Sequence, residues 1–372
     1  MGALFFYKYG SRISDYVFLL FLPYLAILYL YFFRLNGSLF NEKMSQYVLI
    51  LSNILLVIGS GVVFTYVDVL DLDVDRWSVI THYWDYFFDG KYPYTSSSHM
   101  GNFPGPYPFY YMIALPFYLL GEIGWMPILG ILLLQVFTHW QYKSWQINLT
   151  IFILSMASIG LPYEILTRST LFFFSVLVLM ALDYFLKTWF GQTRWQVVLT
   201  AFLIGLLTCT RPVYGLVFLI GGIYAIRKNF DSTMLWLSIV SSALGLVLPF
   251  LHLYLLFPDL FFEFNPVTFM TENFVPTWFY VVYLLVAVGM GWIVKSRDAI
   301  ILYAGAFLMF VVACYAILQV YRHGWHDAIF GHFIDITYFI MALPFLIAAL
   351  AQHLAKKSPI LTDPEVIHRS TS

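Results

Sequence analysis

Three aspartates at every second position, Asp71, Asp73 and Asp75, begin the longest stretch of this sequence that is not hydrophobic. A carboxylate at a membrane surface can accept the proton of an attacking hydroxyl group, which is the work of a general base. Asp75 directly precedes a segment of helical periodicity, and Asp73 lies two residues before it. We therefore expect Asp75 first, and Asp73 second, to be catalytic. The alternative is that these residues only cap the helix and hydrate a loop, because aspartate is a favoured N-cap residue.

The segment from Asp75 to Asp89 has the pattern of an amphipathic helix. Apolar side chains, Trp77 and Trp84 among them, recur on one stripe at helical spacing. Tryptophan in such a stripe favours a helix that lies in the headgroup region of a membrane. Gly90 follows as a stop signal. The sequence thus predicts an acidic cluster at the start of a juxtamembrane helix.

Composition indicates a membrane protein. Hydrophobic residues make up 61% of the 372 residues, charged residues only 10%, and the mean hydropathy is +0.80. A soluble domain carries about 25% charged residues, so this chain cannot build a surface that faces water throughout. A net charge of -1 without a basic tract gives no reason to expect a nucleic-acid partner. The cysteines, Cys209 and Cys314, lie in apolar runs and are expected to pack rather than to bind metal.

The hydrophobic runs predict an all-α, polytopic integral membrane protein with about eleven spans, since a span needs about 20 mainly apolar residues. The runs cover residues 16–33, 47–66, 126–142, 146–161, 169–186, 195–209, 212–226, 234–257, 276–294, 299–320 and 335–353. A further run at 109–120 is broken by Pro116 and ended by Gly121, which favours a re-entrant or interfacial helix. We expect residues 1–372 to form a single transmembrane domain.

Lysine and arginine in short loops predict the orientation, because they favour the cytoplasmic side of a membrane. Basic residues fall in alternate loops, at Lys143, Lys187, Arg227, Lys295 and Lys356. If the run at 109–120 does not cross, all of these loops share the cytoplasmic side. Residues 67–121 then form an external catalytic loop with juxtamembrane helices, and residues 354–372 a cytoplasmic tail. The external side would be periplasmic in a bacterial inner membrane, or luminal in the endoplasmic reticulum.

Arginines at helix ends on the expected external side are candidates for binding phosphate. They are Arg168, Arg211 and Arg322. Arginine recognises phosphate through a planar, bidentate fork of donors. The alternative is that each side chain only reaches to the lipid headgroups.

His323 and His326 belong to a compact polar segment that ends at Asp327. The His-x-x-His spacing is compatible with a metal ion or a general acid. Two histidines and one carboxylate are a weak metal motif, so we assign no metal ligands. The binding of a divalent cation is left as an alternative. We expect these histidines to bind substrate hydroxyls or phosphate.

The stretch from Asp71 to Pro116 resembles the first external loop of the GT-C glycosyltransferases, which are integral membrane enzymes that use polyprenyl-phosphate-linked sugars. Asp73-Val74-Asp75 and Gly90-Lys91-Tyr92-Pro93-Tyr94 are similar to motifs of the first mannosyltransferase of GPI-anchor assembly. Pro104-Gly105-Pro106-Tyr107-Pro108 takes the place of the proline-rich segment of that family. Thr210-Arg211-Pro212-Val213-Tyr214 resembles a basic-proline step in bacterial polyprenol-phosphate-mannose-dependent relatives.

The sequence departs from the family pattern in two places. The family usually has one helix before this loop, whereas two hydrophobic runs precede it here. The segment 95–102 is also longer and richer in serine than the family pattern. Outside residues 71–116, only the rhythm of hydrophobic runs agrees.

The resemblance implies an enzyme that transfers a sugar, such as mannose, from a polyprenyl-phosphate donor to a lipid-linked or other glycan acceptor. We assign no required cofactor, and a divalent cation is possible. Asp75 and Asp73 would supply the base, and Arg211, ahead of Arg168 and Arg322, would bind the phosphate. Tyr94 is a candidate for stacking on a sugar ring.

Two rival functions remain open at this stage. The first is a lipid-linked oligosaccharide polymerase or ligase, which also has many spans and external Arg and His. The second is a lipid-glycan transporter or flippase, which should place charges near the midplane of its helices. Asp183 and Glu164 are the nearest candidates for such charges, and both lie close to predicted helix ends. Their position argues against transport.

Overall fold

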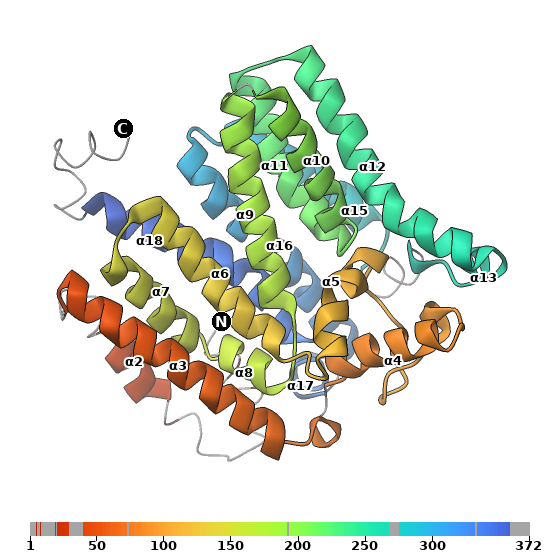
Figure 1. The fold of residues 1–372 in the computed structure, drawn as a ribbon, viewed down its shortest axis with the longest axis horizontal. Coiled ribbons are helices and arrows are strands. Elements are labelled where there is room, and N and C mark those ends of the chain that lie inside the picture. The colour runs from red at the N-terminus through yellow and green to blue at the C-terminus, as the bar shows by residue number, and fades with distance from the viewer. Residues whose placement is uncertain are drawn as a thin grey trace.

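The computed structural model describes residues 40–72, 74–191, 193–267, 275–331 and 333–357, together with Phe5, Lys8, Leu19 and residues 21–29. Regular structure in this part of the chain is helical throughout, without a strand, which confirms the predicted all-α class. Figure 1 shows the arrangement of the helices.

The helices follow the hydrophobic runs of the sequence. The longer apolar ones are α3 (Glu42–Tyr66), α6 (Trp125–Tyr142), α9 (Leu171–Phe190), α12 (Ser232–Leu256) and α16 (Arg297–His323). The shorter helices are α2 (Phe21–Tyr29), α7 (Trp145–Ala157), α8 (Gly160–Leu166), α10 (Arg194–Thr208), α11 (Pro212–Lys228), α15 (Trp278–Ile293) and α18 (Leu343–Lys357). The connecting segments contain η4 (Val69–Asp71), α4 (Arg76–Phe88), η5 (Pro93–Thr95), α5 (Pro108–Leu119), α13 (Pro258–Glu263), α17 (Trp325–Phe330) and η6 (Ile336–Ala342).

Five helical segments of the described chain are long and apolar enough to cross a membrane. They are Glu42–Tyr66, Leu171–Phe190, Ser232–Leu256, Arg297–His323 and Ile336–Lys356. A sixth is reached if α7 and α8, which meet at 70°, count as one bent span. The helices α10, α11 and α15 lie where spans are predicted but have only 15, 17 and 16 residues. Length and composition therefore show a membrane protein without showing all of the predicted spans.

The helix α5 agrees with the prediction of a short helix in the first large loop. It has 12 residues, which at about 1.5 Å per residue is too short for a hydrocarbon core of about 30 Å. The helices α4 and α5 pack against each other, and α5 also contacts α10 and α12. Figure 1 shows α4, α5 and α13 together at one end of the molecule.

The helices α10 and α12, which both contact α5, pack closely against each other. The helices α10 and α12 approach through Gly205 and Gly245. A Cβ atom at Gly205 would lie 2.0 Å from the backbone oxygen of Ser242, and one at Gly245 would lie 2.2 Å from that of Phe202. Only glycine allows this contact, and small residues at a helix interface are typical of packing within membranes.

Ion pairs gather at the opposite end of α9, α16 and α18. Asp183 of α9 binds Lys187 and Arg297, each at 2.7 Å. Lys356 of α18 binds Asp298 of α16 at 2.8 Å. Lys187 and Lys356 belong to loops or ends predicted to be cytoplasmic. Arg76, next to the acidic stretch, contacts Ser169 just before α9 and Asp335 and Thr337 at the start of η6, so the apolar length of α9 separates two polar ends.

Candidate functional site

Arg76, the first residue of α4, ties the acidic stretch to two distant segments. Its guanidinium donates hydrogen bonds to Ser169 Oγ at 2.7 Å, to Asp335 Oδ2 and to Thr337 Oγ1. The side chain is only 11% exposed. Ser169 lies just before α9, and Asp335 is the N-cap residue of η6. One buried side chain thus fixes the start of α4 to the starts of α9 and η6.

The ion pair between Arg76 and Asp335 keeps both groups charged. Burial raises the pKa of the Asp335 carboxyl, but the charge of Arg76 and hydrogen bonds from Thr337 outweigh it, so the net pKa is lowered. Burial acts to lower the pKa of Arg76, but the charges of Asp335, Tyr338 and Glu164 outweigh burial, so the net pKa is raised. The pair therefore remains ionised across the physiological range.

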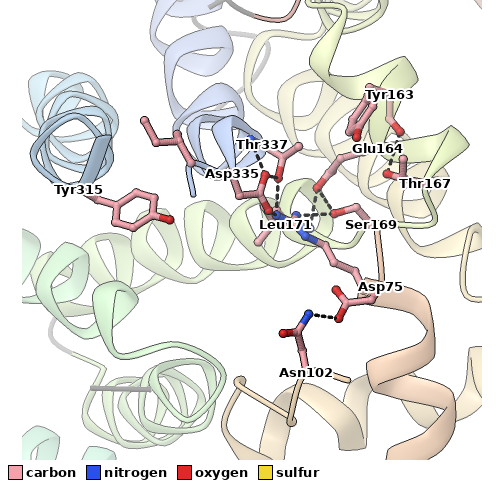
Figure 2. A network of polar contacts seen from close by, with 12 residues as sticks. Asp75, Asn102, Tyr163, Glu164, Thr167, Ser169, Leu171, Tyr315, Asp335 and Thr337 are labelled. Carbon is pink, nitrogen blue, oxygen red and sulfur yellow. Dashed lines mark hydrogen bonds and ion pairs between the residues drawn. The ribbon is translucent and has the colours of Figure 1, made fainter. Parts of the chain in front are cut away.

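Glu164 supports this arrangement from the end of α8. It has no exposed surface and accepts hydrogen bonds from Ser169 Oγ at 2.9 Å, from the Leu171 N–H at 2.9 Å and from the Phe172 N–H at 3.0 Å. The two N–H groups belong to the first turn of α9, so the carboxylate satisfies donors that have no partner within the helix. Figure 2 shows Glu164 and Ser169 on one side of the network, with Asp335 and Thr337 on the other.

Asp75 is half-buried and is held by the segment 95–102. Its Oδ2 atom accepts hydrogen bonds from Ser98 Oγ at 2.6 Å and from Asn102 Nδ2 at 2.7 Å. Figure 2 shows the bond between Asp75 and Asn102. The residue occupies the N-cap position of α4, yet its side chain makes no capping hydrogen bond. The other carboxylate oxygen, Oδ1, accepts no hydrogen bond from the described residues. The carboxylate is thus oriented by one oxygen while the second is available to a ligand.

The serine-rich segment folds back along α4 and forms further contacts with it. The His99 Nδ1 atom lies 2.8 Å from Ser78 Oγ, and His82 Nδ1 lies 2.6 Å from the Ser97 backbone oxygen. The His99 ring also stacks on Trp77. The stretch in which the sequence departs from the family pattern is therefore the one that positions Asp75.

The other two aspartates of the cluster differ from Asp75. Asp71 ends η4 and is exposed. Asp73, the second predicted catalytic residue, lies outside the described residues. Asp75 is the member of the cluster with defined hydrogen-bond donors.

Arg211 is a buried cation without a carboxylate partner among the described residues. It is 9% exposed, it precedes α11 as the N-cap residue, and its Nε atom is buried without a hydrogen-bond partner in that part of the chain. Its Cζ atom lies 5.7 Å from the ring centroid of Tyr110 and 5.6 Å from that of Tyr338, whose hydroxyl is hydrogen-bonded to the guanidinium. A buried charge is costly unless it is paired. An anionic ligand would supply the missing pair.

Arg211 lines a cavity of about 360 Å³ between α11, α15, α16 and η6. Four tyrosines contribute to its wall. They are Tyr280, Tyr283, Tyr315 and Tyr338. Apart from these and Arg211, the lining side chains are apolar, with Leu216, Leu284 and Met341 among them. One cation in an otherwise apolar and aromatic chamber suits an amphiphile that has an anionic group and a hydrocarbon chain.

Two tyrosines connect the surroundings of Asp75 to those of Arg211. The Tyr338 ring centroid lies 5.2 Å from Arg76 Cζ and 5.6 Å from Arg211 Cζ. The hydroxyl of Tyr111 is buried, and both the Arg211 and the Asp75 charges act on it. Burial first, then Tyr110, Tyr83 and Asp75, raise the pKa of this phenol, whereas Arg211 acts to lower it. The structure thus brings Asp75 and Arg211, predicted separately, to the same region.

Arg168 has a role within the fold. It is 3% exposed and has a φ of 50°. Its guanidinium donates to the backbone oxygens of Leu166, Phe64 and Val67 at 3.0, 3.2 and 3.0 Å, and its Nε lies 3.6 Å from Glu122 Oε1. Arg168 borders a different pocket, beside Glu122, and does not line the Arg211 cavity.

The predicted cluster at the end of α16 also lies apart from the Arg211 cavity. Arg322 and His326 are exposed, and His326 Nδ1 lies 3.3 Å from Asp327 Oδ1. His323 stacks on Phe333 with ring centroids 3.7 Å apart. None of these residues lines the cavity. The described residues contain no group of His, Cys, Asp and Glu side chains arranged to hold a metal ion.

Tyr94 packs inside the loop and is not on a binding surface. It is fully buried, and its hydroxyl donates to the Pro106 backbone oxygen at 2.7 Å. Its ring meets Tyr83 and Tyr111 edge-on. In this structure Tyr94 holds the proline-rich segment and has no surface for a sugar.

Comparisons with known proteins give no match to a protein family, to a curated protein or to a solved structure.

Several residues of the site carry no signal in the sequence that singles them out. They are Arg76, Ser98, Asn102, Asp335 and Tyr338. The polarity of Arg76 next to Asp75 was visible, but its partners follow 93 to 261 positions later. The serine-rich composition of 95–102 was the one available indication, because it supplies side-chain donors beside a carboxylate.

Proposed function

We propose that this protein is a multi-pass membrane glycosyltransferase of the GT-C type. It transfers a hexosyl group, with mannose as the expected sugar, from a polyprenyl-phosphate donor to a lipid-linked or other glycan acceptor. One observation carries the proposal: Arg211, a buried cation without a carboxylate partner among the described residues, lines a cavity rich in tyrosine. Asp75, which has one carboxylate oxygen that no described residue binds, adjoins Arg76, and Arg76 lies against the same Tyr338 ring as Arg211. The family resemblance of residues 71–116 supports the same assignment.

The arrangement suits glycosyl transfer from a lipid phosphate. The bond between the anomeric carbon and the phosphate oxygen breaks, and a glycosidic bond forms to the acceptor oxygen. Asp75 Oδ1 accepts the proton of the acceptor hydroxyl. Arg211 stabilises the phosphate as it departs, because a preorganised cation in a largely apolar cavity interacts strongly with developing charge. The aliphatic and tyrosine side chains of the cavity hold the first part of the hydrocarbon chain.

The charge distribution supports an external site. Lys187, Arg297 and Lys356 lie together at the end of the helices away from Arg76. By the preference of basic residues for the cytoplasm, that end faces the cytoplasm, and Asp75 faces the periplasm or the lumen. In this proposal α10, α11 and α15 complete a set of about eleven spans, with shorter helices accommodated by local thinning of the bilayer.

Transport is less well supported, because the charges nearest to the helix interiors have structural partners. Asp183 binds Lys187 and Arg297, and Glu164 caps α9. Neither faces a described cavity as an unpaired charge. A polymerase or ligase would use the same external face. Its product distinguishes it, because such an enzyme transfers a whole glycan in one step, whereas the proposed enzyme adds a single sugar.

Transfer of labelled mannose from polyprenyl phosphate-mannose, measured in membranes that contain the full-length protein, tests the proposal. We expect Asp75→Asn to lower transfer by at least about 100-fold, the usual contribution of a general base. Asp71→Asn changes an exposed carboxylate four residues away and serves as the matched control. Asp73→Asn tests whether Asp73, the second predicted base, which lies outside the described part of the chain, contributes to transfer. Full activity of Asp75→Asn would exclude this residue as the base.

A further inference from the structure

The start of α4 depends on few contacts of its own. Asp75 makes no side-chain cap, and the first turn is closed by the Val79 N–H and the Ser78 hydroxyl, which donate to the Asp75 backbone oxygen at 3.0 and 2.9 Å. The loop that orients the carboxylate, through Ser98 and Asn102, is itself partly exposed. An external anchor is needed if Asp75 is to keep a fixed distance from Arg211.

Arg76 has the geometry of such an anchor. It adjoins Asp75 in the chain, and its guanidinium is bound by Ser169, Asp335 and Thr337, which belong to two separate segments. Its Cζ atom also lies 5.2 Å from the centroid of Tyr338, the ring that Arg211 shares. The contacts of Arg76 thus fix Asp75 relative to the part of the molecule that holds Arg211.

We propose that Arg76, through its ion pair with Asp335 and its contacts to Thr337 and Ser169, is a positioning residue that sets the Asp75 carboxylate against the bound donor. This inference rests on the proposed function. Arg76 does not touch the reacting atoms in this scheme, because its donors face Asp335, Thr337 and Ser169. Its effect comes from geometry, and a displacement of a catalytic group by about 1 Å can lower a rate by about 100-fold.

The first experiment measures hydrogen exchange of the backbone amides in the purified full-length protein. Asp335→Asn removes the charge that holds Arg76 and keeps the size of the side chain. We expect exchange in residues 75–79 and 97–102 to become at least about tenfold faster, since local opening sets exchange rates. The matched control is Asp89→Asn, which breaks the exposed ion pair with Lys91 on the same loop. It should leave exchange at 75–79 unchanged.

The second experiment separates kcat from KM in the mannosyl-transfer assay. Asp335→Asn and Arg76→Met should lower kcat by at least about tenfold, while KM for the donor stays within about twofold, because Arg211 is untouched. Arg76→Lys keeps the charge but cannot reach all three partners, so it should restore part of kcat. The double variant Arg76→Met with Asp335→Asn should lose no more than the worse single variant, because both act through one interaction.

The outcomes distinguish this inference from the proposed function. Unchanged exchange at 75–79 in Asp335→Asn overturns the positioning role. A rise in donor KM equal to the fall in kcat also overturns it, since that result indicates that Arg76 contributes to donor binding. Absence of transfer by the unsubstituted protein overturns the proposed function, whereas faster exchange confined to 75–79 and 97–102 would still support Arg76 as the anchor of Asp75.

Discussion

Arg76 and Arg211 share one aromatic ring, that of Tyr338, with Cζ atoms 5.2 and 5.6 Å from its centroid. The two cations differ in one respect. Arg76 is neutralised by Asp335, whereas Arg211 has no carboxylate within 4 Å among the described residues. An aromatic face attracts a cation but does not neutralise it. Arg211 therefore has no paired carboxylate among the described residues, and an anion bound there would supply the pair.

Replacing Arg211 should separate stability from donor binding. In Arg211→Gln, we expect donor KM to rise by about thirtyfold, because a charged hydrogen bond contributes about 2 kcal/mol. The midpoint of thermal unfolding without donor should stay unchanged or rise, because an unpaired buried charge is removed. Mannosyl transfer and thermal unfolding of the same preparation measure the two effects.

The control for Arg211 is Arg322→Gln at the exposed end of α16. Surface substitutions change free energies by about 0.5 kcal/mol or less, so donor KM should change by about twofold or less. A loss of donor binding in Arg322→Gln would indicate that the donor phosphate binds at the Arg322–Asp327 segment. Strong destabilisation by Arg211→Gln would show that this arginine is structural.

The donors to Asp75 should affect the rate of transfer without affecting donor binding. Ser98→Ala and Asn102→Ala each remove a hydrogen bond to Oδ2, of 2.6 and 2.7 Å. We expect each variant to lower kcat by about tenfold, in line with about 1.4 kcal/mol for a lost hydrogen bond. Ser97→Ala is the matched control, because Ser97 contributes its backbone oxygen to His82. Equal rates in all three variants would show that the orientation of Asp75 is set elsewhere.

Stability should fall in acid through Asp335. The pKa of this carboxyl is lowered in the folded protein, with burial opposed by Arg76 and Thr337, while in an unfolded chain it is about 3.9. Its contribution to stability is therefore fully present above the unfolded pKa and is lost as pH falls through the folded pKa. Thermal unfolding between pH 7 and pH 3 should show a smaller acid loss for Asp335→Asn than for the unsubstituted protein. Parallel curves for the two proteins would contradict this assignment.

The positions of most helices could be predicted from the sequence, because apolar side chains in a membrane protein must be contiguous along a span. The run at 47–66 became Glu42–Tyr66, and the run at 299–320 became Arg297–His323. The run at 146–161 instead breaks at Ile159, which has a φ of 58°. Gly160 and Pro162 were the available signals for this break.

The site could be predicted only in part. The aspartate cluster and Arg211 were visible because charges are rare in so apolar a chain. The capping alternative for Asp75 followed from residue preference, but the structure shows that Ser98 and Asn102 bind its carboxylate instead. The pair Arg76–Asp335 joins residues 259 positions apart. Periodicity reports which face of a helix is buried and contains no information on such a partner.

Glu164 should be one of the most sensitive positions for stability. Its carboxylate accepts hydrogen bonds from Ser169 Oγ and from the N–H groups of Leu171 and Phe172 without any exposure to solvent. Glu164→Ala leaves these donors buried and unsatisfied, at about 1–3 kcal/mol each, so we expect destabilisation by about 3 kcal/mol or more. Glu164→Gln keeps one acceptor oxygen and should lose less.

Thermal unfolding of the purified protein compares these variants with Glu263→Gln, which changes an exposed carboxylate at the end of α13. The control should unfold at the same temperature as the unsubstituted protein. Transfer by Glu164→Gln, measured well below its unfolding temperature, should remain close to normal, because Glu164 reaches Asp75 only through Ser169 and Arg76. An unfolding temperature of Glu164→Ala equal to that of the control would show that α9 does not need this cap.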